Sequence, residues 1–187
     1  MKLNVGCARN IKEGYINIDL CPEDYPEVQD QITKADALHL PYDDESIDEI
    51  WAEHFIEHLT YMEAEYALIE WERVIKNGGK LIIGVPDMDI MAKHWLEIYE
   101  KPIVGDSIVH WVAYWGQALY GSQMQTTFHK SAWNPHILAS FVCAGKFRMT
   151  KIYHKDYDFH LWEEFEKDET INSHPVFPRR PIFDTVP

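Results

Sequence analysis

Three apolar segments near the N-terminus each end in a residue that suits ligand binding. Residues 3–5 are followed by Gly6, residues 15–20 contain Asp19, and residues 32–37 contain Asp36. In an open parallel sheet, ligands bind beyond the carboxyl ends of the strands. Glycine leaves room there, a carboxylate at Asp19 can accept both hydroxyl protons of a ribose, and Asp36 is placed to accept from an adenine amino group. The spacing therefore predicts a site for an adenosyl group.

Strand-like and helix-like segments alternate through the first half of the chain, which is typical of a parallel α/β sheet. A helix is well signalled after the fourth strand, because Thr60 and Glu63 form a capping box and apolar residues follow at helical spacing. We expect Asn77-Gly78-Gly79 to end this helix. Asn134-Pro135 opens another helix, which we expect to end at Gly145. Predicted strands cover residues 3–5, 15–20, 32–37, 47–52, 80–85 and 147–154, and residues 159–165 are either a last strand or a helix.

Residues 86–132 differ in composition from their surroundings, being rich in Trp, Tyr, His and Met and poor in charge. We interpret them as a helical and loop insertion that forms a lid over the end of the sheet. Its aromatic side chains either line an acceptor pocket or form a lid core or an oligomer contact. The domain is expected to span residues 1–172, with an extended Pro-rich tail at 173–187. The aromatic residues concerned are Trp95, Trp111, Tyr114, Trp115 and Tyr120.

The bulk composition restricts the function classes. The 187 residues are 46% hydrophobic and 26% charged, an ordinary globular balance that fits one domain. The net charge of −14 opposes binding to phosphate backbones, so we expect no nucleic-acid partner. No segment has the apolar length of a membrane span or a secretory signal, and three scattered cysteines fit reduced thiols. We therefore expect a cytoplasmic protein without a membrane partner, and a homodimer stays open.

Several motifs resemble those of the seven-strand S-adenosylmethionine (SAM)-dependent methyltransferases. The resemblance runs continuously over residues 2–87, and later segments resemble a short subgroup of predicted methyltransferases, some from polysaccharide or glycan pathways. The first motif, Leu3-Asn4-Val5-Gly6-Cys7-Ala8, is similar to the family's Leu-Asn-Leu-Gly-Cys-Gly. The other matching segments are 14–19, 35–37, 40–50, 53–58 and 73–81, followed downstream by 120–123, 129–131 and 144–147.

The resemblance implies a Rossmann-like, mostly parallel sheet of about seven strands in a single domain, with SAM as cofactor. It implies methyl transfer to a small molecule or sugar, at oxygen or nitrogen. Gly6 would lie against the methionine and ribose of SAM, Asp19 would bind the ribose hydroxyls, and Leu20 would pack on the adenine. The other cofactor-binding residues implied are Cys7, Ala8, Asp36, Ala37 and Glu53, the last lining the methyl-transfer site through its backbone.

The first motif departs from the family at its second glycine, which is Ala8 here, and at the third position, which is Asn10. We expect Ala8 to adopt an ordinary backbone conformation, where glycine would be freer. The link from Gly6 to Tyr15 is also short for a parallel crossover, so the first helix is expected to be a single turn or absent. A dipole from that helix then contributes little to cofactor binding.

Methyl transfer from a sulfonium needs alignment and, for an oxygen acceptor, a base. His54, His58 and His129 are the candidate bases, since the unperturbed pKa of histidine is near neutrality. Structural roles compete with this interpretation, such as the capping of a turn by His58. No Asn/Asp-Pro-Pro-Tyr/Trp sequence follows the fourth strand, which argues against amino methylation of DNA bases.

Other function classes fit the sequence less well. His54, Glu57 and His58 match the His-x-x-Glu-His pattern of zinc peptidases, but the cap at Thr60 starts the helix after them, so no metal ligand is assigned. A SAM-binding protein without catalysis is the main alternative, because the first motif has lost its second glycine. A nicotinamide dehydrogenase is disfavoured because the full Gly-x-Gly-x-x-Gly is absent.

Overall fold

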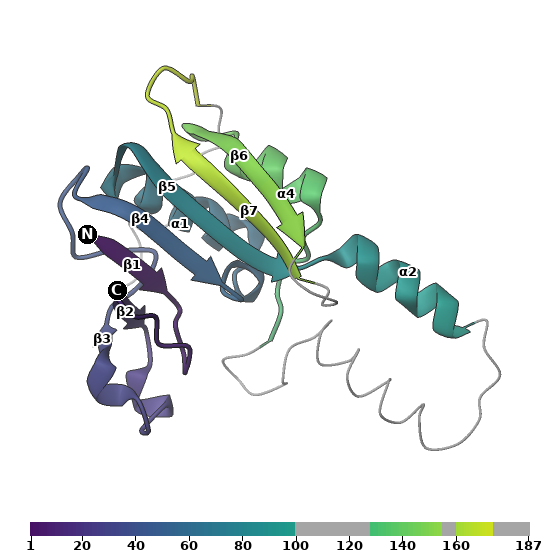
Figure 1. Cartoon of the computed structure of the whole chain (residues 1–187), viewed down its shortest axis with the longest axis horizontal. Coiled ribbons are helices and arrows are strands. Elements are labelled where there is room, and N and C mark those ends of the chain that lie inside the picture. The colour runs from purple at the N-terminus through teal and green to yellow at the C-terminus, as the bar shows by residue number, and fades with distance from the viewer. Residues whose placement is uncertain (100–127, 155–159, 174–187) are drawn as a thin grey trace, which may run out of the picture.

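Seven strands form one sheet in the order β3-β2-β1-β4-β5-β7-β6 in the computed structural model, which describes residues 1–99, 128–154 and 160–173 (Figure 1). The five strands from β3 to β5 pair in parallel, and β7 is antiparallel to both β5 and β6. This confirms the predicted Rossmann-like sheet and shows that the described residues of the candidate segment 159–165 belong to strand β7. The strands are β1 (Lys2–Val5), β2 (Ile16–Asp19), β3 (Ile32–Lys34), β4 (Ile47–Glu53), β5 (Ile75–Pro86), β6 (Phe147–His154) and β7 (His160–Lys167).

Two helices, α1 (Tyr61–Val74) and α4 (Pro135–Val142), lie behind the sheet in the view of Figure 1, and α2 (Met88–Tyr99) extends away from the end of β5. Three short 3-10 helices complete the described part: η1 (Pro22–Asp24), η2 (Gln29–Gln31) and η3 (Ile56–His58). Both predicted helices are confirmed, α1 with its capping box and α4 with Pro135 in its first turn. None of the helices among these residues is long and apolar enough to cross a membrane.

The core lies between the sheet and the helices α1 and α4. Successive strand residues point to opposite faces, so Leu81, Ile83 and Val85 of β5 share one face, and all three belong to the core. The face toward the helices is buried together with the apolar stripe of α1, and the indole of Trp71 donates to the backbone oxygen of Ala37 at 3.0 Å. This bond ties the core to the loop after β3. The buried residues of α1 are Ala64, Ala67, Leu68, Trp71 and Val74.

The end of α1 differs from the prediction. The helix stops at Val74 and β5 begins at once, so Asn77-Gly78-Gly79 lies inside the strand and does not form a separate stop. Ile75 pairs with Ile47, and the register then shifts before Lys80 pairs with Glu49. Gly78 has φ +74, a value that glycine adopts at no steric cost. The glycines therefore accommodate an irregular strand. An Asn-Gly-Gly sequence is typical of a turn, so the sequence alone does not predict a strand here.

The connection between β1 and β2 contains no helix, as its length predicted. Two buried amide side chains hold it against the strands. Asn4 donates to the backbone oxygen of Asn10 at 2.7 Å and to the side-chain oxygen of Asn17 at 2.8 Å, and that same oxygen accepts from the backbone N–H of Lys12 at 2.8 Å. These bonds fix the path of the chain that follows Gly6.

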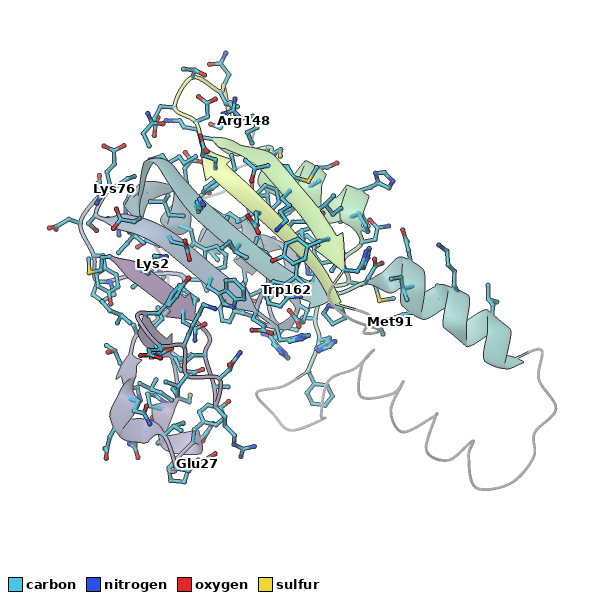
Figure 2. The ribbon with its side chains drawn as sticks, in the orientation of Figure 1. Lys2, Glu27, Lys76, Met91, Arg148 and Trp162 are labelled. Atoms are coloured by element: carbon cyan, nitrogen blue, oxygen red, sulfur yellow. The ribbon has the colours of Figure 1, made fainter. Side chains whose placement is uncertain are left out.

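The opposite face of the sheet carries an aromatic cluster in the described part of the chain. Trp162 of β7 lies on this face (Figure 2), with its ring centroid 4.8 Å from that of Trp51. The ring of Tyr153 is stacked on that of Trp162, with 6.4 Å between the two centroids. Nζ of Lys12 lies 3.6 Å from the ring centroid of Trp51. The short β1–β2 connection thus packs on this face through a cation–π contact.

The capping box of α1 provides a stability test. The Thr60 hydroxyl accepts from the Glu63 backbone N–H at 3.2 Å, and the Glu63 carboxylate accepts from the Thr60 backbone N–H at 2.7 Å. Thr60→Ala removes the hydroxyl acceptor and should lower the free energy of unfolding by about 1 kcal/mol in urea titrations. Thr60→Ser keeps the acceptor and should match the parent; equal losses in both variants would contradict the role of the cap.

Glu163 of β7 is a buried carboxylate whose two oxygens have no hydrogen-bond partner among the described residues. Burial, together with the nearby charge of Asp87, raises the pKa of Glu163 to about 8. Because this folded-state pKa exceeds the unfolded value, ionisation opposes folding, and stability is lost as the pH rises from the unfolded pKa to the folded one.

We expect the parent protein to be less stable at pH 9 than at pH 5 by an amount on the order of 4 kcal/mol through Glu163 alone. Glu163→Gln removes the titration, so it should be more stable than the parent at pH 9 and close to it at pH 5. Chemical denaturation at the two pH values measures both differences. A constant difference between variant and parent at both pH values would show that Glu163 does not titrate in this range.

Candidate functional site

A cavity of about 390 Å³ lies at the carboxyl ends of β1, β2 and β3 and extends to the turn after β4. Its size falls in the range of small-molecule sites. The walls come from each of the loops that follow these strands, as expected for an open parallel sheet. The lining residues are Gly6, Ala8, Ile18, Asp19, Leu20, Cys21, Asp24, Tyr25, Ala35, Asp36, Ala37, Leu38, His54, Phe55, His58, Leu59, Phe128 and Lys130.

Asp19, the last residue of β2, is held by two backbone groups. Its Oδ2 accepts from the N–H of Ala8 at 3.0 Å, and its Oδ1 accepts from the N–H of Cys21 at 3.0 Å. An ionised carboxylate oxygen can accept more than one hydrogen bond, so both oxygens keep acceptor capacity toward the cavity. The carboxylate is therefore fixed in orientation and still able to bind a pair of hydroxyl groups.

Asp36 follows β3 and forms the neighbouring wall of the cavity. Its Oδ1 accepts from the N–H of Leu38 at 2.9 Å, and its Oδ2 lies 3.4 Å from Nδ1 of His39. Ala37 and Leu38 add apolar surface beside it, while Leu20 lines the cavity from the β2 side. A flat aromatic ring could pack between these apolar groups and reach the Asp36 carboxylate at its edge.

Gly6 lines the cavity, but the reason why glycine is needed at this position differs from the one predicted from the sequence. It has φ +62, and a Cβ at this position would overlap the ring of Phe55. The side chain of Phe55, from the turn after β4, occupies the space that the missing side chain leaves. Glycine is therefore required by the backbone conformation and by packing against Phe55, in addition to any ligand.

The expectation that Ala8 has an ordinary backbone conformation is wrong. Ala8 has φ +46, in the left-handed region that costs an L-residue roughly 1–2 kcal/mol. In this conformation its N–H points at Asp19. The chain thus keeps the conformation that the family's second glycine favours, and it does so without the glycine.

Two predicted cofactor-binding residues do not line the cavity. Cys7 is buried, and burial together with the charge of Asp19 raises the pKa of its thiol to about 12, which keeps it neutral. Glu53 accepts from the side-chain amide of Asn10 at 2.8 Å and from the indole of Trp51 at 3.2 Å. It therefore anchors the β1–β2 connection, and the residues that reach the cavity from the turn directly after it are His54 and Phe55.

His54 follows β4 with φ +50, a strained conformation for a residue with a side chain. Its backbone N–H donates to the oxygen of Gly84 at 2.9 Å, and its Nδ1 lies 3.1 Å from Oε1 of the buried Glu57. Burial opposes ionisation of Glu57, but the hydrogen bond and charge interactions with His54 and His58 outweigh it and lower the pKa. A charged carboxylate therefore orients the imidazole of His54 toward the cavity.

The other two candidate bases lie side by side. His58 is in η3 and lines the cavity, and its ring centroid is 5.0 Å from that of His129. His129 itself is not a lining residue, although its neighbours Phe128 and Lys130 are. The structure therefore brings His54, His58 and His129 to one end of the cavity, from two segments far apart in the sequence.

Part of the predicted acceptor region lies outside the described residues. Trp111, Tyr114, Trp115 and Tyr120 belong to this part, and Trp95 falls within α2. The sequence interpretation missed Asp24, Tyr25 and Lys130 as lining residues. The acid-rich loop after the second strand and the His129-Lys130-Ser131 segment were the signals that could have found them.

Comparison with known proteins agrees with this geometry. Residues 5–83 match the family model of the methyltransferase domain. A methyltransferase named GfsG from Streptomyces halstedii is 46% identical over 71 residues, which cover 37% of this chain and 23% of that protein. An uncharacterized protein from Methanocaldococcus jannaschii is 36% identical over 73 residues, which cover 37% of this chain and 31% of that protein. The matched segments thus span less than a third of either relative.

Solved structures resemble the chain over most of its length. A SAM-dependent methyltransferase from Methanosarcina mazei has a TM-score of 0.64 at 14% identity, covering 89% of this chain and 92% of that one. A 1,6-didemethyltoxoflavin-N1-methyltransferase from Burkholderia thailandensis, with bound 1,6-didemethyltoxoflavin and S-adenosylhomocysteine (SAH), has a TM-score of 0.58 at 12% identity, covering 90% and 71%. At such identities the likeness concerns the fold.

The fold is a Rossmann-like domain with a cavity at the carboxyl ends of its parallel strands. The chain has the seven-strand fold of the SAM-dependent methyltransferases, as its motifs predicted, and its residues 5–83 match the methyltransferase domain model.

The strain at Ala8 can be measured. Ala8→Gly relieves the left-handed penalty but adds freedom to the unfolded chain, which costs roughly 0.4–1 kcal/mol. We expect the variant to be more stable than the parent by up to about 1 kcal/mol in denaturant titrations. Ala132→Gly is the matched control, since Ala132 has no positive φ and should only lose stability. Equal losses in both variants would place Ala8 in an unstrained conformation.

Proposed function

We propose that this protein transfers a methyl group from SAM to an oxygen or nitrogen of a small molecule or a sugar or glycan acceptor. The observation that carries the proposal is the convergence of Asp19 and Asp36 on one cavity at adjacent strand ends, with Gly6 beside them. The matched methyltransferase domain covers these residues.

The residues of the cavity suit SAM. Asp19 presents two fixed oxygens for the ribose hydroxyls, and Asp36 with Ala37 and Leu38 offers a polar and apolar edge for adenine. Asp24 adds a further carboxylate to the lining, and acidic walls favour a cofactor that carries a sulfonium charge. Lys130 is the cationic side chain among the described lining residues and suits the cofactor's carboxylate.

The cofactor supplies an electrophilic methyl group on a positively charged sulfur. The chain's contribution is alignment of an acceptor with that methyl group and removal of the acceptor's proton. His54 suits the second role, because the carboxylate of Glu57 holds its Nδ1–H and thereby leaves the lone pair on Nε2. Nε2 would take the proton of the acceptor as the new bond to carbon forms.

Charge and relatives support a small acceptor. The net charge of −14 and the acidic cavity walls repel polyanions. The solved methyltransferase from Burkholderia thailandensis holds a small molecule beside SAH.

Three free cysteines among the described residues agree with a reducing, cytoplasmic setting. A homodimer is compatible with these features but is not required by the cavity.

Calorimetric titration with SAH tests the cofactor site. Asp19→Ala removes the acceptor pair and should weaken SAH binding roughly 10- to 150-fold, the equivalent of about 1.5–3 kcal/mol. Asp19→Asn keeps one carbonyl oxygen that can accept the bond from Ala8. Its SAH affinity should therefore lie between that of the parent and that of Asp19→Ala.

Asp30→Asn is the control, because Asp30 is exposed in η2 and does not line the cavity. Its SAH affinity should match that of the parent. If Asp19→Ala bound SAH as tightly as the parent, the assignment of the cavity would be wrong. Tight SAM binding without turnover on any tested hydroxyl or amine acceptor would favour the alternative of a non-catalytic SAM-binding protein.

A further inference from the structure

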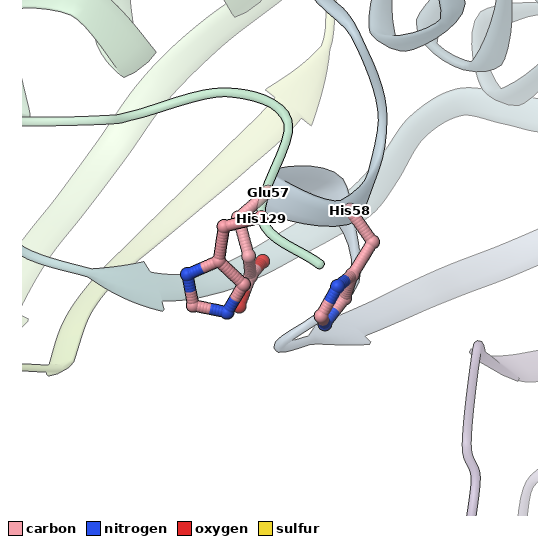
Figure 3. Close-up of side chains that lie close together, drawn as sticks. All are labelled: Glu57, His58 and His129. Atoms are coloured by element: carbon pink, nitrogen blue, oxygen red, sulfur yellow. The ribbon is translucent and has the colours of Figure 1, made fainter. Parts of the chain in front are cut away.

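Glu57, His58 and His129 form a compact cluster beside the cavity. One ligand-type atom of each residue lies within 4.8 Å of the other two. Figure 3 shows the carboxylate of Glu57 between the imidazole rings of His129 and His58. Two of these residues come from η3 and the third lies 71 positions further along the chain, so the fold assembles the cluster.

The carboxylate of Glu57 is incompletely satisfied. Glu57 is 1% exposed, and its Oε1 lies 3.1 Å from Nδ1 of His54. Its Oε2 is buried and has no hydrogen-bond partner in the part of the chain that the structure describes. A buried anionic oxygen without a partner is costly, and a cation at this point would remove the cost.

The imidazole of His58 has the orientation of a metal ligand. Its Nδ1 lies 3.1 Å from the backbone oxygen of Phe128, so the proton belongs on Nδ1 and the lone pair on Nε2. Ligating histidines typically donate their second nitrogen to a carbonyl or carboxylate in this way. His54 provides the corresponding outer contact to Glu57.

Backbone hydrogen bonds lock the two ligand-bearing segments together. The N–H groups of Lys130 and Ser131 donate to the backbone oxygen of Glu57 at 2.8 and 3.1 Å. The hydroxyl of Ser131 donates to the oxygen of Ile56 at 3.2 Å. His129 is thereby held beside η3 independently of its own side chain.

We propose that Glu57, His58 and His129 bind one divalent transition-metal ion of the Zn²⁺ type at the edge of the cofactor cavity. Two imidazole nitrogens and one carboxylate oxygen are the donor set of open zinc sites, in which a fourth position takes water or substrate. A small closure of the rings would bring the three atoms to bonding distance. The His54, Glu57 and His58 set of zinc peptidases does not apply, because His54 contacts the carboxylate and His129 supplies the second nitrogen.

The role of this ion rests on the proposed methyl transfer. His58, Phe128 and Lys130 line the cavity, so the open position of the metal would face an acceptor. A hydroxyl bound there has a lowered pKa and loses its proton to water or to His54. The resulting oxygen anion forms the bond to the methyl carbon while the carbon–sulfur bond breaks toward sulfur, giving the methyl ether, the neutral thioether and one proton. The acceptor class is therefore a hydroxyl compound that binds a metal.

Calorimetric titration of the full chain with ZnCl₂ at pH 7.5 tests the site. We expect one Zn²⁺ per chain, with a Kd in the micromolar range or below. His129→Ala should weaken binding by at least about 100-fold, since loss of a ligand should exceed the 10- to 100-fold effect typical of an outer partner. His54→Ala changes such an outer partner and should cost roughly 10-fold. His136→Ala, an exposed histidine of α4 outside the cluster, should leave the Kd unchanged.

The proposal is overturned if the parent shows no saturable 1:1 binding, or if His129→Ala and His136→Ala bind Zn²⁺ equally. Glu57→Gln is a second variant, and circular dichroism verifies the folding of each. SAH titrations separate the two hypotheses: Asp19→Ala should lose SAH and keep Zn²⁺, whereas His129→Ala should lose Zn²⁺ and keep SAH. If one of the two sites does not exist, binding of the other ligand can still be measured.

The open coordination position has its own test. Co²⁺ in place of Zn²⁺ gives a visible absorption spectrum that reports coordination. Acetohydroxamate, a chelating oxygen ligand, should change this spectrum in the parent and in His136→Ala. An unchanged spectrum at saturating acetohydroxamate would show that the ion is closed to an acceptor, and the proposed role would be wrong.

Discussion

The buried hydrogen bond between Asn4 and Asn17 is the interaction on which the cavity at the ends of β1 and β2 depends. The link from β1 to β2 is too short for the helix that usually makes a parallel crossover. The two amides replace that helix by bonding the backbone at Asn10 and Lys12, so the link is tied to the strands it joins. Only with this path fixed does the N–H of Ala8 reach the carboxylate of Asp19. Two polar groups at the centre of the sheet thus set the geometry of a binding site at its edge.

Residues with positive φ recur around the same cavity. Gly6, Ala8 and His54 all have positive φ and all line it. Strained residues persist only where their surroundings determine them, and here the determinants are visible. Ala8 is held by Asp19, and His54 by the oxygen of Gly84 and the carboxylate of Glu57. These strained conformations cost folding stability, and they orient the N–H of Ala8 at one end of the cavity and the imidazole of His54 at the other.

Local signals made much of the fold predictable. Gly6, Asp19 and Asp36 could be placed at strand ends because alternation and turn residues mark short strands, and Thr60 with Glu63 marked the start of α1 without reference to any other part of the chain. Ala8 and Asn77-Gly78-Gly79 were misjudged because their conformations are imposed by Asp19 and by pairing with β4. Glu57 was seen only in a zinc-peptidase pattern, since nothing local shows that His129 would reach it. Interactions between distant segments are what sequence periodicity does not contain.

The two ends of the cavity are built differently, and this bears on how such a domain changes its acceptor. The end proposed to bind the adenosyl group uses residues within the first 40 positions, joined by short links and held by backbone bonds. The other end combines η3 with residues 128–131, which return from the aromatic segment and dock on the oxygen of Glu57. Under the proposed function, a change within the segment between them would alter what meets the methyl group while the docking bonds keep His129 beside His58. Under the proposed function, cofactor binding and acceptor choice are therefore separable, and the cluster of Glu57, His58 and His129 lies at the boundary between them.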